Sequence, residues 1–238
     1  MVHCIENLLS NNPYPGRGIL IGCCGSGRRS VLVYFIMGRS ENSRNRVFER
    51  TEDGIRTAAF DPAKLTDPSL VIYHPVRNIG KRTIVTNGDQ TDTIYDYLKS
   101  NSDMHKALQT REFEPDPPNF TPRISGLIEP DGSYTLSILK TPAGSSEQCQ
   151  RNFYEYSSAI PGLGHFISTY ETDGDPLPSF KGEPITVGIH NSYDLKTFAD
   201  NIWNALNEQN KVSLYARERD LVTGEVNDLI INKHEVSF

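Results

Sequence analysis

The sequence predicts an α+β fold in which two mainly antiparallel β-sheets stack face to face and helices cover their outer faces. The 238 residues include 18 glycines and 15 prolines, a content typical of many short elements joined by turns. Short β-branched and aromatic runs recur along the chain and follow one another through hairpin-type turns. No regular alternation of strand, helix and strand runs through the chain, so a parallel sheet of the Rossmann or TIM type is disfavoured.

The N-terminal strands carry the strongest signals. Ser30–Gly38 reads SVLVYFIMG, a composition typical of a strand buried on both faces. Arg17–Cys23 predicts a short apolar strand before it, with Gly25–Arg29 as the turn. The polar octapeptide Arg39–Arg46 follows as a predicted loop, and loops at the ends of buried strands often carry binding residues.

The middle of the chain combines strands with two helices. We expect helices over Asp92–Asn101, with Thr91 as N-cap, and over Ser102–Glu112, with Ser102 as N-cap. The predicted strands are Val47–Arg50, Gly54–Phe60, Ser69–Arg77 and Arg82–Thr86, the first two forming a hairpin.

The C-terminal half begins with Phe113–Pro122, whose four prolines exclude regular structure. A clear hairpin follows over Arg123–Glu129 and Ser133–Thr141. Its second strand alternates apolar with small polar residues, which predicts one dry and one solvated face. An amphipathic helix is predicted over Tyr193–Glu208. The remaining predicted strands are Gln150–Tyr156, His165–Thr172, Ile185–His190, Lys211–Arg217 and Glu225–Ile231.

Composition narrows the class of protein to one globular domain over residues 1–238. Hydrophobic residues make up 37% of the chain, enough to bury a core. The net charge of −6 disfavours a nucleic-acid partner, and no apolar run is long enough to span a membrane. Residues 1–15 lack a signal peptide's apolar segment, so we expect a cytoplasmic protein. The four cysteines form no C-x-x-C pair or Cys/His cluster, so no metal site is predicted.

Positive charge is concentrated in one window. Residues 17–50 contain seven arginines, no lysine and two glutamates, a local charge of +5, which leaves −11 for the rest of the chain. Arginine offers a planar fork that matches phosphate and carboxylate, so this window predicts a small anionic ligand. The alternative is a set of solvated arginines paired with acids elsewhere.

Several short motifs, in order, carry a family resemblance. They are Gly16-Arg17, Gly38-Arg39-Ser40 with Arg44-Asn45-Arg46, Tyr73 with Arg77, Asn87-Gly88 with Thr91-Asp92, Glu114 and Asp116 with Thr121-Pro122-Arg123-Ile124, and Ser168-Thr169-Tyr170. Together they resemble the archaeal-type IMP cyclohydrolase family and its bacterial relatives. In one departure, Phe120 stands between Asn119 and Thr121, where the family pattern joins Asn directly to Thr-Pro-Arg. Residues 1–13 and those from about 190 onward look like additions to the family core.

The resemblance implies a fold and a reaction. The fold is a four-layer αββα sandwich like that of the N-terminal-nucleophile hydrolases, without their self-processing. The reaction closes the formylated aminoimidazole-carboxamide ribotide to IMP with loss of water. The substrate is then a phosphate-bearing purine ribotide, and neither a metal nor another cofactor is required. A homo-oligomer is compatible with all of these features.

The same resemblance, with the chemistry of the side chains, predicts the site. Tyr73, Glu114 and Arg44 are the candidate catalytic residues: the Tyr73 hydroxyl would donate to the formyl oxygen, and burial would raise the pKa of Glu114. Arg44 and Arg46 would share one face if their stretch is extended. The candidate substrate-binding residues are Arg39, Asn45, Arg46, Asn87, Gly88, Thr91, Asp92, Arg123 and Tyr170.

Two other functions are open at this point. One is an amide hydrolase on the same fold, with Cys23, Cys24 or Ser26 as nucleophile, although adjacent cysteines in an apolar stretch are more typical of buried, inert thiols. The other is a non-catalytic purine-nucleotide-binding protein.

Overall fold

The computed structural model describes residues 1–65, 71–142, 145–190 and 194–234, and it confirms an α+β fold with two antiparallel sheets. In these residues the first sheet has the strand order β11 (Ile185–Gly188), β10 (Leu163–Ser168), β1 (Arg17–Cys23), β2 (Arg29–Met37), β12 (Lys211–Asp220) and β13 (Val226–Asn232). The second has the order β3 (Arg46–Thr51), β4 (Gly54–Ala59), β5 (Val76–Ile79), β6 (Arg82–Thr86), β7 (Arg123–Ile128), β8 (Tyr134–Lys140) and β9 (Gln150–Tyr156).

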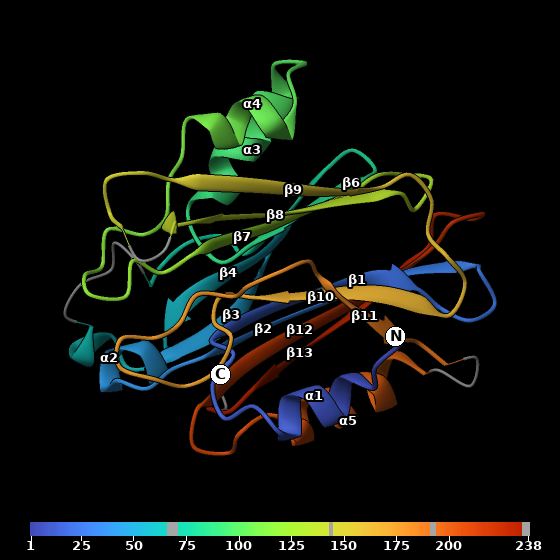
Figure 1. Cartoon of the computed structure of the whole chain (residues 1–238). Helices are drawn as coiled ribbons and strands as arrows, with labels where there is room; N and C mark the ends of the chain where they lie inside the picture. The colour runs from blue at the N-terminus through green and yellow to red at the C-terminus, as the bar shows by residue number, and fades with distance from the viewer. Residues whose placement is uncertain (66–70, 143–144, 191–193, 235–238) are drawn as a thin grey trace.

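The two sheets lie face to face, with helices outside them (Figure 1). The helices α3 (Gln90–Lys99) and α4 (Met104–Gln109) cover the second sheet, and α1 (Ile5–Ser10) and α5 (Leu195–Ala205) cover the first. Three apolar clusters fill the interfaces between these layers. In β1, Ile19 and Ile21 belong to the cluster between the sheets, whereas Leu20 packs with the α5 side. Both faces of this strand are therefore dry, which explains its continuous apolar sequence.

The C-terminal segment contributes an interior strand. β12 pairs with β2 on one side and with β13 on the other, and Tyr215 of β12 lies opposite Tyr34 of β2. Residues beyond about 190 thus supply one interior strand and one edge strand of the first sheet.

The stretch Arg39–Arg46 is not the loop that the sequence predicts. It contains the one-turn helix α2 (Glu41–Arg44). Ser40 accepts a hydrogen bond from the backbone N–H of Ser43, and the Ser43 hydroxyl accepts one in return from the N–H of Ser40. This reciprocal cap stabilises a helix start, typically by about 1 kcal/mol. Arg44 and Arg46 therefore do not share a face of an extended segment.

The strand predicted over Ser69–Arg77 is also wrong in its extent. Ser69 and Leu70 lie outside the described residues, and β5 begins only at Val76. Pro75, which lacks a backbone N–H, cannot donate to a strand ladder. A short 3-10 helix, Pro62–Lys64, precedes this segment.

The predicted helices exist, but they begin at other residues. Asp89 precedes α3 and Thr91 lies inside it, while Asp103 caps α4 by accepting from the N–H of Lys106. Asp194 caps α5, and Tyr193 lies outside the described residues. Helix α1 was not predicted.

The second strand of the clearest hairpin has no solvated face along most of its length. Ser137 of β8 is fully buried, although its sequence neighbours alternate as in a half-exposed strand. The cluster formed by α3, α4 and the outer face of β7 and β8 explains this burial. In the described part of the chain no helix is long and apolar enough to cross a membrane.

Candidate functional site

Polar side chains gather at one end of the sandwich, between the sheets. Arg17 begins β1 and pairs with Ile36 at the end of β2, so both lie at this end. Arg17 shares the inward face of β1 with Ile19 and Ile21, which points it toward the second sheet. Its Nε is buried and has no hydrogen-bond partner in the described residues. Burial lowers the pKa of Arg17, but Glu114 and nearby tyrosines together raise it above its ordinary value.

Arg46 is the first residue of β3 and is fully buried. Its Nε donates to the carbonyl of Ser43 at 2.8 Å, and Nη2 donates to that of Met37 at 3.4 Å. Nη1 has no partner in the described parts of the chain. Burial is the main cause that lowers the pKa of Arg46, and the positive charge of Arg17 is the next. Two guanidinium groups whose charges act on each other, each with an N–H that has no partner in the described residues, favour an anion between them.

Tyr34 and Tyr73 join the two sheets. Their hydroxyl oxygens lie 2.9 Å apart, and both side chains are buried. Thr57 of β4 holds Tyr73 in place: its N–H donates to the Tyr73 carbonyl at 2.9 Å, and its Oγ1 accepts from the Tyr73 N–H at 2.9 Å. Burial is the main cause that raises the pKa of Tyr34, and the neighbouring Tyr73 is the next. The Tyr34 hydroxyl therefore stays protonated.

Glu114 supplies a buried carboxyl group. It is 3% exposed, and its backbone N–H donates to the carbonyl of Thr121 at 2.9 Å, which closes the proline-rich loop. Burial raises the pKa of Glu114 to about 7, against the opposing charges of Arg17 and Arg123. A carboxyl with this pKa can both accept and donate a proton near neutral pH.

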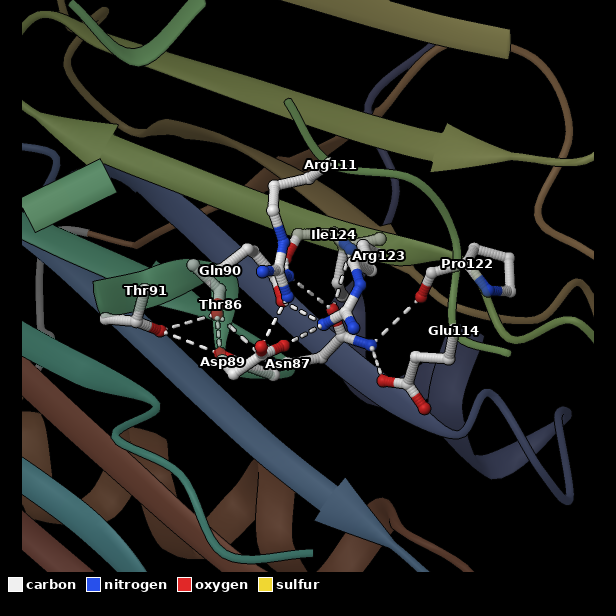
Figure 2. Close-up of polar contacts among 11 residues, drawn as sticks. Thr86, Asn87, Asp89, Gln90, Thr91, Arg111, Glu114, Pro122, Arg123 and Ile124 are labelled. Carbon is white, nitrogen blue, oxygen red and sulfur yellow. Dashed lines mark hydrogen bonds and ion pairs between the residues drawn. The ribbon is translucent and has the colours of Figure 1, made fainter. Parts of the chain in front are cut away.

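Asn87 connects Glu114 to the start of α3 (Figure 2). Its Nδ2 donates to Glu114 Oε1 at 3.4 Å and to the Pro122 carbonyl at 2.9 Å. Its Oδ1 accepts from the Ile124 N–H at 2.8 Å and from Gln90 Nε2 at 3.0 Å. Asn87 is fully buried, so these bonds fix its orientation.

Arg123 extends the same network (Figure 2). Its Nη1 lies 2.7 Å from Gln90 Oε1 and 2.7 Å from Asp89 Oδ1, and Arg111 also pairs with Asp89. Gly88 passes close to this guanidinium, because a Cβ there would lie 2.5 Å from Arg123 Nη1. A side chain at position 88 would therefore displace Arg123.

Tyr170 closes the site from the first sheet's side. Its hydroxyl lies 2.6 Å from Thr121 Oγ1, and its ring stacks on Tyr14 with centroids 5.9 Å apart. Gly16, with φ of +77°, passes beneath this ring, and a Cβ there would lie 2.5 Å from a Tyr170 ring carbon. Arg39 is exposed at the rim, 5.2 Å from the Tyr14 ring centroid and paired with Asp173 at 2.8 Å.

The other predicted site residues make contacts outside this cluster. Arg44 donates from Nε to the Gly38 carbonyl at 2.9 Å and from Nη2 to Asn210 Oδ1 at 3.0 Å. Asn45 exchanges two 2.8 Å hydrogen bonds with the backbone of Asp61. These bonds tie α2 and its flanking residues to neighbouring segments.

Thr91 and Asp92 lie in the first turn of α3. The Thr91 hydroxyl is buried, 2.6 Å from that of Thr86 and 3.1 Å from the Gly88 carbonyl. Asp92 pairs with Arg77 at 3.0 Å. Both residues shape the loop that carries Asn87 and Gly88.

The cluster also includes residues outside the predicted set: Arg17, Tyr14 and Tyr34. Arg17 belongs to the Gly-Arg motif and to the Arg-rich window, which were the signals that could have identified it. Tyr34 had no such signal, because an aromatic residue inside an apolar strand is usually core.

Cys23 and Cys24 lie at the far end of β1. Cys23 is six residues from Arg17 along an extended strand, about 20 Å away. Burial raises the pKa of Cys23 to about 11. Cys24 accepts a hydrogen bond from the Arg29 N–H at 3.3 Å and lies 3.1 Å from Ser26 Oγ, within the β1–β2 turn. No group of three or more His, Cys, Asp or Glu residues in the described chain could hold a metal ion.

Comparison with known proteins identifies the family. The model of the IMP cyclohydrolase-like protein family matches residues 14–224. The chain is 26% identical over 162 residues to the IMP cyclohydrolase of Methanococcus aeolicus, covering 66% of this chain and 74% of that protein. It is 29% identical over 184 residues to the IMP cyclohydrolase of Methanopyrus kandleri, with 71% and 89% covered. It is 32% identical over 165 residues to the IMP cyclohydrolase of Methanococcus maripaludis strain C7, which covers 66% of this chain and 75% of that protein. The match reaches from Tyr14, which stacks on Tyr170, past the end of the interior strand β12. On this breadth the chain belongs to the IMP cyclohydrolase-like protein family.

Proposed function

We propose that the protein is an IMP cyclohydrolase, which closes the formylated aminoimidazole-carboxamide ribotide to IMP with loss of water. The observation that carries the proposal is the buried carboxyl of Glu114, with a pKa of about 7, beside two arginines that have open N–H donors. The family match and the IMP cyclohydrolases among its relatives supply the substrate class.

Ring closure makes one C–N bond and then breaks one C–O bond. The carboxamide nitrogen attacks the formyl carbon and loses a proton, while the former formyl oxygen gains charge and then a proton. That oxygen then takes up a second proton and leaves as water. The former formamide nitrogen gives up its proton and forms the C=N bond that completes the pyrimidine ring. The reaction needs a proton acceptor, a proton donor and a partner for the developing oxyanion.

We assign these tasks to residues of the buried cluster. Glu114 takes the proton from the carboxamide nitrogen and returns it to the leaving oxygen, for which a pKa near 7 is suited. Tyr73 donates its hydroxyl hydrogen bond to the formyl oxygen, and Tyr34 at 2.9 Å orients that hydroxyl. Asn87 and Arg123 hold Glu114 and the start of α3 in register.

The phosphate of the substrate is assigned to the arginines. Arg46 and Arg17 each have a buried N–H without a partner in the described chain, and a phosphate oxygen would satisfy both. Arg39 is exposed and lies over the ring of Tyr14, which stacks on Tyr170, so the ribotide would enter beside Arg39. Four other predicted site residues contact neighbouring segments of the chain, which favours a role in positioning the loops of the site. They are Arg44, Asn45, Thr91 and Asp92.

The fold family, the cellular location and the oligomeric state are part of the same proposal. The order of helix, sheet, sheet and helix supports a fold like that of the N-terminal-nucleophile hydrolases, used without self-processing. The cytoplasmic location and a homo-oligomer stay predictions.

The direct test is a spectroscopic assay of ring closure by the purified protein. Conversion of the formylated ribotide to IMP well above the uncatalysed rate is expected. Tight IMP binding without acceleration would instead favour a purine-nucleotide-binding protein.

A further inference from the structure

A cavity lies beside the site, and its lining residues have none of the roles assigned above. It has a volume of about 560 Å³, within the range of small-molecule pockets. Two loops form its walls. Pro118 and Phe120 come from the loop that carries Glu114, and Pro176 and Pro178 come from the segment that follows Tyr170. The ends of β8 and β9 close it, so it lies at the edge of the second sheet opposite β3.

Two lysines give this cavity a positive character. Lys140, at the end of β8, is half-buried, and one of its three N–H groups donates to the Phe180 carbonyl at 2.7 Å. Lys181 also lines the cavity and pairs with Glu171 at 3.0 Å. Burial first and the charge of Lys181 second lower the pKa of Lys140, and Glu171 opposes them only in part, so the two ammonium groups repel each other. A bound anion would relieve this repulsion.

Phe120 and three prolines supply apolar lining to this cavity. Phe120 has a φ of +43°, an unusual conformation for a bulky residue. Its backbone N–H donates to the Asp116 carbonyl at 3.1 Å, and its ring meets that of Phe113 edge-on at 5.6 Å. The loop thus maintains a strained residue whose ring lines the cavity, together with proline rings.

We propose that this cavity binds a small aromatic phosphate monoester, of about the size of a nucleoside monophosphate, at a site separate from the Arg17–Arg46 cluster. Lys140 and Lys181 bind the phosphate as point charges, and the ring lies against Phe120 and the prolines.

The cavity is coupled to the active-site cluster through its walls. The Leu177 N–H donates to Asn119 Oδ1 at 3.0 Å, which joins the two loops. Thr121, next to Phe120, accepts from the Glu114 N–H through its carbonyl and contacts the Tyr170 hydroxyl through Oγ1. A ligand that orders these loops would therefore also fix Glu114 and Tyr170. The binding claim itself does not depend on the proposed reaction.

Calorimetric titration with AMP tests the proposal in four variants and the wild type. Wild type should bind AMP in two classes of site, because the arginine cluster also binds ribotides. Lys140→Met should weaken one class tenfold to a hundredfold, as expected for a lost charge-assisted bond. Phe120→Gly should weaken the same class, and glycine accepts the positive φ of this position, so the loop backbone should keep its conformation. Arg46→Lys should affect only the other class, and Lys99→Met, at the exposed end of α3, should affect neither.

Three results decide the matter. A single class that Lys140→Met and Phe120→Gly weaken, and that Arg46→Lys leaves unchanged, still supports the cavity. Binding that is unaffected by Lys140→Met and Phe120→Gly overturns the proposal. A single class weakened by both Lys140→Met and Arg46→Lys shows one continuous site and also overturns it. Because binding is the readout, absence of ring closure would contradict the proposed function and leave this inference standing.

Discussion

The hydroxyl groups of Tyr34 and Tyr73 form a hydrogen bond of 2.9 Å that connects a central strand of one sheet to the segment entering β5 of the other. Tyr34 is fully buried, and Tyr73 is 6% exposed. The pair therefore fixes two hydroxyl groups near the buried guanidinium groups of Arg17 and Arg46. Its geometry depends on both sheets at once.

Tyr73→Phe tests this hydroxyl directly. Phenylalanine keeps the buried ring, so the fold and most of the ribotide affinity should be retained. If the hydroxyl meets charge that develops on the formyl oxygen, its loss should lower kcat by roughly 10²–10³-fold. Steady-state kinetics of ring closure give the value. Tyr134→Phe is the matched control. Tyr134 is buried at the start of β8, away from the end of β8 that pairs with Arg123, and its hydroxyl bonds to His165. Wild-type activity in Tyr73→Phe would remove this residue from the mechanism.

Arg46→Ala should reduce affinity for IMP far more than affinity for inosine. A charge-assisted contact contributes about 1.5–3 kcal/mol, or about tenfold to a hundredfold in the dissociation constant. Arg46 is fully buried, so the substitution also lowers stability, but a general loss of stability would not separate nucleotide from nucleoside. Arg44→Ala, which removes bonds to Gly38 and Asn210, should change both affinities alike. Equal losses for IMP and inosine in Arg46→Ala would show that Arg46 does not bind the phosphate.

Glu114 should make folding stability depend on pH. Its pKa is raised from 4.5 to about 7 in the folded protein, so folding favours the protonated carboxyl. The stabilisation is fully present below pH 4.5 and is lost as the pH rises through 7, a change of about 3 kcal/mol. Glu114→Gln should flatten the curve between pH 5 and 8. Urea denaturation of both proteins at several pH values measures this difference, and parallel curves would contradict it.

The same carboxyl should appear in the pH dependence of catalysis. If Glu114 accepts the proton of the carboxamide nitrogen, kcat/KM should rise with pH through an inflection near 7. Glu114→Gln should be strongly impaired and should lack that inflection. A variant that keeps the inflection would assign it to another group.

The cysteine variants separate ring closure from a nucleophilic amide hydrolase. Cys23→Ala and Cys24→Ala should each retain turnover within severalfold, because ring closure needs no thiol and both residues lie at the opposite end of β1 from Arg17. The measurement is the rate of ring closure in proteins with wild-type circular dichroism. Loss of activity with an intact fold would favour the hydrolase.

Strands were predictable where the sequence alone determines them. β9 begins and ends as predicted at Gln150 and Tyr156, and β1 at Arg17 and Cys23. The apolar run of β1 and the aromatic residues of β9 both favour strands. The burial of Ser137 was not predictable, since it depends on helices that pack from a distant part of the chain. The one-turn helix α2 was missed because it rests on a two-residue cap.

The site was predictable in part, because local motifs identify single residues but not the contacts that form when the two sheets stack. Glu114, Asn87 and Arg123 were candidates because motifs preserve their spacing, and the structure brings these three together. Tyr34 could not be found, because its partner Tyr73 is distant in sequence and pairing appears only after the sheets stack.

The interior position of β12 has a consequence for synthesis of the protein. A nascent chain that has emerged as far as Tyr170 already contains the proposed active-site cluster, yet one edge of β2 still lacks its neighbour. That edge belongs to the run VLVYFIM, an apolar strand of the kind that pairs with other chains when exposed. The first sheet can close only after residue 220 has left the ribosome, so translation pauses before that point would prolong a state prone to aggregation.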